Sequence, residues 1–137
     1  MSDFREHAAA GMKAIEEKRF EDAIAAFRRA VELQPERPDM NHALGMAYMH
    51  RGETGSAIPH LGRAVELAEP FTEPEVQALK RDFHLQHAAA LQLMDHVAQA
   101  EQALRRAVEL WPDQPEPKLP KRYSENDFQG ETRTLCS

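Results

Sequence analysis

The chain has 137 residues, of which 42% are apolar and 29% charged, so it has room for one globular domain and a tail. Its formal net charge of −6 argues against a nucleic-acid partner, because phosphate binding needs clustered Lys and Arg side chains. No stretch approaches the roughly 20 apolar residues of a membrane span, and the first residues lack the pattern of a signal peptide. We therefore expect a cytoplasmic protein with no membrane span.

Two helices are expected first along the chain. One runs over residues 3–18, and Asp3 and Glu6 are suited to cap its start. The next carries small, large and small side chains at i, i+4 and i+7, so that they share one helix face. These residues are Ala23, Phe27 and Ala30. Pro35 then ends the pair, because proline cannot continue a helix.

A second pair of helices is expected over residues 38–71. Pro38 suits the first turn of its first helix, and Gly52 suits the end of that helix. The small-large-small stripe returns 34 residues after its first copy. It consists here of Ala57, Leu61 and Ala64.

The third pair follows after a longer interval of 43 residues, and its stripe consists of Ala100, Leu104 and Ala107. The nine extra residues fall at 72–80, where Thr72 and Glu75 have the spacing of a capping box. We expect this insertion to lengthen the first helix of the third pair by about 13 Å. The alternative is a disordered loop.

One pentapeptide, Arg-Ala-Val-Glu-Leu, ends all three pairs, at residues 29–33, 63–67 and 106–110. A period of 34 residues made of two helices resembles the tetratricopeptide repeat. The second unit matches that pattern best, through Leu44, Gly45, Tyr48, Ala57, Leu61, Ala64 and Pro70. In the third unit, Ala88 replaces the glycine and Leu91 replaces the tyrosine.

The resemblance implies an all-α fold, a solenoid of three helix-turn-helix hairpins in a right-handed superhelix. The domain would cover residues 3–112, with repeats at about 4–37, 38–71 and 81–112. The remaining residues, 113–137, are rich in proline and polar side chains. We expect this tail to cover the third repeat, to lie in the groove or to be disordered.

No residue pattern indicates catalysis. The chain has no phosphate-binding glycine loop, CxxC pair, HExxH helix or GxSxG turn. His84 and His87 have a spacing that suits metal chelation, but no third ligand is evident, and packing between helices explains them better. We therefore expect no enzyme activity, no cofactor and no metal.

Function is expected in the groove that the resemblance places along the first helix of each pair. Its protein-binding residues would be Arg5, Met12, Ile15, His42, Met46, Met49, His50, Leu85, Ala89 and Leu93. This surface is mainly apolar, with methionine at its middle. Because methionine adapts to irregular partners, such a groove suits an amphipathic helix or an extended apolar peptide.

Some members of the family bind the C-terminal carboxylate of chaperones with lysine, arginine and asparagine. The matching positions here hold Ala8, Met12, Ala43, Asp82 and Gln86, so chaperone-tail binding is disfavoured. The sequence therefore predicts an adaptor that binds a protein or peptide segment. Two alternatives remain, a subunit that assembles into homo-oligomers through its exposed repeat ends and a small metal-handling protein. The second would bind copper through Met46, Met49, His42 and His50.

Overall fold

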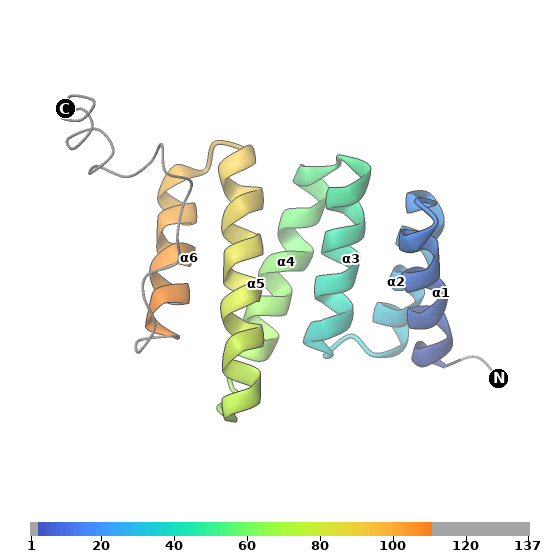
Figure 1. The fold of residues 1–137 in the computed structure, drawn as a ribbon, viewed down its shortest axis with the longest axis horizontal. Helices are drawn as coiled ribbons and strands as arrows, with labels where there is room; N and C mark the ends of the chain where they lie inside the picture. The colour runs from blue at the N-terminus through green and yellow to red at the C-terminus, as the bar shows by residue number, and fades with distance from the viewer. Residues whose placement is uncertain (1–2, 111–137) are drawn as a thin grey trace.

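The computed structural model describes residues 3–110, which form six α-helices and contain no strand. The helices are α1 (Phe4–Glu16), α2 (Phe20–Leu33), α3 (Pro38–Arg51), α4 (Thr54–Ala68), α5 (Pro74–Leu93) and α6 (Val97–Glu109). Each helix packs mainly on its neighbours in sequence, and α1, α3 and α5 lie in front of α2 and α4 in Figure 1. The predicted all-α class is confirmed. The tail at 113–137 lies outside the described residues.

The helix ends follow from local sequence. The Asp3 carboxylate accepts hydrogen bonds from the backbone N–H groups of Arg5 and Glu6, at 2.9 and 3.2 Å. Gly52 ends α3 with a φ of 88°, a left-handed conformation that costs glycine little. The start of α5 differs from expectation. Its N-cap is Glu73, which makes no side-chain capping bond, so the predicted capping box is not formed.

The small-large-small stripes form the core. Phe27 and Leu61 are 2% and 1% exposed, and the alanines around them are fully buried. Gly11 packs so closely on the Phe27 ring that an added Cβ would lie 2.7 Å from it, and Gly45 meets Leu61 at the same distance. Glycine at these positions therefore lets the two helices of a hairpin approach closely. In the third hairpin Leu104 is only half-buried, since no further helix of the described chain packs on α6.

The longest helix is α5, with 20 residues. Because it begins at Pro74, its first turns extend beyond the ends of α3 and α4 (Figure 1). Lys80 lies at the base of these turns and is 4% exposed. Its ammonium group donates to the carbonyl oxygens of Glu69 and Phe71, at 3.0 and 2.9 Å. These bonds satisfy backbone groups just beyond the end of α4, and they fix the connection between α4 and α5.

Candidate binding groove

A cavity of about 280 Å³ lies between α1, α3 and α5, and we call it the α1–α3–α5 groove. It is lined by Met12, Ile15, Phe27, His42, Ala43, Met46, Ala47, His50 and Gln86. Five residues predicted for the binding surface are brought together here: Met12, Ile15, His42, Met46 and His50. Met12 and Ile15 belong to α1, and the other three residues belong to α3. These helices are the first helices of two consecutive repeats, so the 34-residue period places the five residues side by side.

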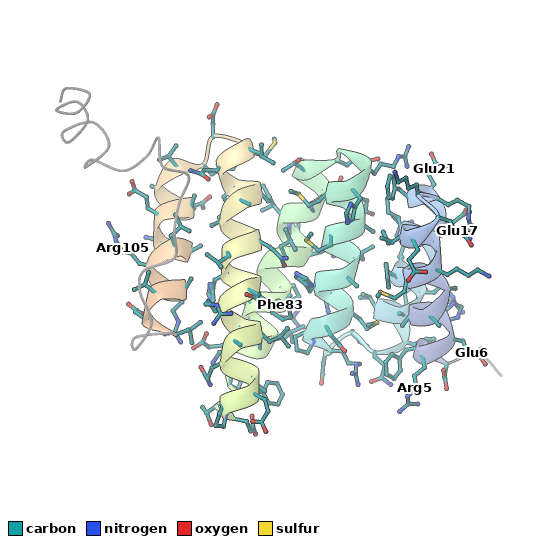
Figure 2. All side chains as sticks on the ribbon, in the orientation of Figure 1. Arg5, Glu6, Glu17, Glu21, Phe83 and Arg105 are labelled. Atoms are coloured by element: carbon teal, nitrogen blue, oxygen red, sulfur yellow. The ribbon has the colours of Figure 1, made fainter. Side chains whose placement is uncertain are left out.

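The other predicted residues do not line this cavity. Arg5 is exposed at the N-terminal end of α1 (Figure 2). Ala89 and Leu93 are exposed on α5, and Leu93 is 67% accessible. Leu85 is half-buried on the same helix. The predicted surface is therefore divided into a cavity between three helices and an outer strip on α5.

Met49 has a different environment from Met46. Both side chains pack against the buried cluster of Ala57, Leu61 and Ala90, but only Met46 also lines the groove. Met49 therefore contributes to the contact between α3, α4 and α5. Met12 is the most open of the groove methionines, with 57% of its surface exposed.

His42 joins α3 to α5 at one end of the groove. Its ring stacks on Phe83 with centroids 4.4 Å apart, and Figure 2 shows Phe83 on the side of α5 that faces α3 and α4. Its Nε2 atom is hydrogen-bonded to the side-chain oxygen of Gln86. Burial lowers the pKa of His42, against the opposing effects of the Gln86 bond and the Asp82 charge. The imidazole is therefore neutral at pH 7.

His50 occupies a second position on α3, two helical turns after His42. Its ring stacks on Phe20 of α2, with centroids 5.5 Å apart and planes 11° apart. An aromatic ring thus holds each groove histidine in place. Four residues line the groove without having been assigned to the binding surface from the sequence, and Gln86 is the one with a polar side chain. The resemblance had matched Gln86 to a carboxylate-binding position of the family, and that match was the available signal.

No lysine, arginine or carboxylate is among the residues that line the groove. Asp39, in the first turn of α3, is held by the guanidinium of Arg37 through two bonds of 3.0 and 2.8 Å. The groove can thus accept apolar side chains and form a few hydrogen bonds with neutral imidazole and amide groups. It offers a buried ligand no compensating charge.

Within residues 3–110, no three His, Cys, Asp or Glu side chains are grouped so that they could hold a metal ion. None of the described helices is both long enough and apolar enough to cross a membrane.

Comparison with known proteins identifies the family. The sequence pattern of the tetratricopeptide repeat family matches residues 14–83, and the chain belongs to this family. No curated protein matches the chain in sequence.

Solved structures agree with this assignment. The first TPR domain of Spaghetti (RPAP3), bound to the HSP90 peptide SRMEEVD, matches with a TM-score of 0.70 and 17% identity, over 98% of this chain and 94% of that one. The N-terminal domain of STI-1 from C. elegans matches with a TM-score of 0.70 and 20% identity, over 80% and 85%. SycD from Yersinia enterocolitica, in complex with a peptide of the translocator YopD, matches with a TM-score of 0.67 and 20% identity, over 82% and 79%. At these identities the matches show the shared fold.

Proposed function

We propose that this protein is a non-catalytic adaptor that binds an apolar segment of another protein in the α1–α3–α5 groove. The observation that carries the proposal is the lining of the groove, where methionine and other apolar side chains surround three polar groups, none of them a lysine, an arginine or a carboxylate. Binding there would remove apolar surface from water without burying an unpaired charge. The peptides bound to RPAP3 and to SycD support a peptide-binding role for this fold.

The groove chemistry favours one kind of segment. Met12 and Met46 are unbranched and have three rotatable side-chain bonds, so they can adapt to partners of irregular shape. Their positions on two neighbouring helices form a shallow apolar floor. An amphipathic helix that presents apolar side chains at i, i+3 and i+4 fits such a floor.

The adaptor role predicts a selective loss of binding. Replacing Met12→Glu and Met46→Glu together should weaken partner binding by on the order of tenfold or more, because each carboxylate would be desolvated against an apolar ligand. Tagged wild-type and variant proteins would be compared by quantitative pull-down from the source cells. Far-UV circular dichroism would confirm that both proteins remain helical.

The matched control is Met94→Glu, since Met94 is 45% exposed at the end of α5 and does not line the groove. Proteins retained by the wild type and by Met94→Glu, but lost from the double variant, would be groove ligands. Equal retention by all three proteins would exclude this groove as the binding site.

The groove should also reject acidic C-terminal peptides. The peptide SRMEEVD, which RPAP3 binds, carries several carboxylates, and no lysine or arginine lines the groove to pair with them. We expect no saturable binding of fluorescently labelled SRMEEVD at protein concentrations up to about 1 mM, with the RPAP3 domain as positive control. A dissociation constant below about 100 μM, measured by anisotropy, would contradict this selectivity.

A further inference from the structure

The repeat creates two equivalent positions, one between α2 and α4 and one between α4 and α6, and they are filled differently. Between α2 and α4, the Arg28 guanidinium donates to the Tyr48 hydroxyl at 2.6 Å. The Tyr48 ring in turn stacks on His60, with centroids 5.6 Å apart and planes 11° apart. These three side chains, one from each of α2, α3 and α4, connect the first two hairpins.

The corresponding position between α4 and α6 holds much smaller side chains. The offsets of the pentapeptide, 34 and then 43 residues, align Arg28 with Gly62, Tyr48 with Leu91 and His60 with Ala103. A guanidinium, a phenol and an imidazole are thus replaced by a hydrogen atom, an isobutyl group and a methyl group. The repeat therefore retains the helices at this position but not the side chains that fill the space between them.

A cleft of about 370 Å³ lies at this second position, and we call it the α4–α6 cleft. It is lined by Ile58, Val65, His84, His87, Leu91, Gln99, Gln102, Ala103 and Arg106. Its volume is in the range of known ligand pockets. The apolar side chains come from all three helices, and the two histidines come from α5.

His84 is the most informative residue of the cleft. Its side chain lines the cleft, the residue is 7% exposed, and its ring makes no hydrogen bond within residues 3–110. Burial, reinforced by the nearby positive charge of Arg106, lowers the pKa of His84 to about 4. The ring is therefore neutral at pH 7 and offers one N–H donor and one nitrogen acceptor. Among residues 3–110 the only fully buried side-chain nitrogen or oxygen without a partner is Nε2 of His7, so the His84 nitrogens are open to the cleft, where a ligand can reach them.

The remaining polar groups restrict the charge of that partner. Burial also lowers the pKa of His87, whose Nε2 atom would lie 3.4 Å from a Cβ placed on Gly62. Arg106 donates to the carboxylates of Glu69 and Glu109, so its charge is already compensated. The cleft thus presents neutral hydrogen-bonding groups beside apolar walls, which favours a neutral ligand with an apolar body.

We propose that the α4–α6 cleft is a second binding site, which takes the aromatic side chain of a tyrosine from a partner protein. The filled position between α2 and α4 shows which group these helices accommodate, since a tyrosine ring stacks there on an imidazole. In the α4–α6 cleft the partner supplies the phenol ring, and His84 or His87 supplies the hydrogen bond to its hydroxyl group. The ring contacts Leu91 and Ala103, the residues that replace Tyr48 and His60.

The test uses the full chain and two matched probes, N-acetyl-tyrosinamide and N-acetyl-phenylalaninamide. Their binding would be followed by NMR chemical shifts of the His84 and His87 ring protons. We expect saturable shifts with the tyrosine probe in the millimolar range, and about 3- to 10-fold weaker binding of the phenylalanine probe, which lacks the hydroxyl group. Absence of a saturable shift, or equal affinity for the two probes, would overturn the proposal.

Two double variants test the comparison between repeats. Leu91→Tyr with Ala103→His copies the filled arrangement into the cleft and should abolish the shifts. Tyr48→Leu with His60→Ala removes it from the first position and should create a new site there. Binding that survives the filling variant contradicts the assignment. If the probe binds only after Trp111 and Tyr123 are replaced by alanine, the chain itself supplies the occupant and an external partner is excluded.

Discussion

Replacement of Phe27→Ala is expected to lower the free energy of unfolding by about 3–5 kcal/mol, the largest effect of any single change considered. Phe27 is 2% exposed, and its ring fills the space that Gly11 leaves open in α1. Its removal would leave a cavity between α1, α2 and α3, since the residues around it belong to one buried cluster. Urea denaturation followed by circular dichroism would measure the loss.

The matched control is Phe71→Ala. Phe71 is also a phenylalanine, but it is 46% exposed in the connection between α4 and α5. We expect the control to cost less than about 1 kcal/mol, because little surface returns to water. If the two variants lost similar stability, the close packing of Phe27 on Gly11 would not be the source of the effect. A domain of this size is stable by only about 5–15 kcal/mol, so Phe27→Ala removes a large share of the total stability and is best studied at low temperature.

Acidification is the second change with a large expected effect. The pKa of His84 is lowered from 6.5 to about 4, chiefly because burial disfavours the charged ring. Between these two values the unfolded chain binds a proton that the folded chain does not, so acid favours unfolding. The stabilisation is present at pH 7 and is lost as the pH falls from about 6.5 toward 4. Burial also lowers the pKa values of His42, His60 and His87, which act in the same direction.

His84 alone should account for a loss of about 2 kcal/mol between pH 7 and pH 5. Urea denaturation at both pH values would measure it. In His84→Asn, the difference between the free energies of unfolding at pH 7 and pH 5 should be smaller by that amount. Asparagine is chosen because it is the residue at the equivalent position, 41, of the preceding repeat. The control is His96→Asn, at an exposed position before α6, which should keep the wild-type difference. An unchanged difference in His84→Asn would show that His84 is not protonated on unfolding.

The sequence predicted the fold because its signals were local and repeated. Three copies of one pentapeptide, each overlapping the end of a small-large-small stripe, specify the face of α2, α4 and α6 that packs inward. The cap at Asp3 was also predicted, since it depends on backbone groups only a few residues away. The capping box at Thr72 and Glu75 was wrong, because the helix begins one residue later than that motif requires.

The groove was predicted less completely than the fold. Its position followed from the repeat, but a helix face does not reveal how deeply each residue lies between neighbours. Met46 and Met49 differ in this way, since only one of them lines the cavity. The link between His42 and Gln86 joins residues 44 positions apart in the chain, and it depends on the stacking of His42 over Phe83. No local pattern in either segment specifies such a pair.

The order of helix contacts has a consequence for how the domain folds and opens. Each helix packs mainly on the helices before and after it in the chain, so most contacts close short segments of backbone. Such a topology has a low contact order, which favours rapid folding from almost any hairpin. The same arrangement allows the first or the third hairpin to unfold locally while the middle hairpin stays folded. The hydrogen bonds from Lys80 to the carbonyl oxygens of Glu69 and Phe71 lie between the second and third hairpins. The third hairpin can therefore separate from the second only if this buried ammonium group loses both bonds.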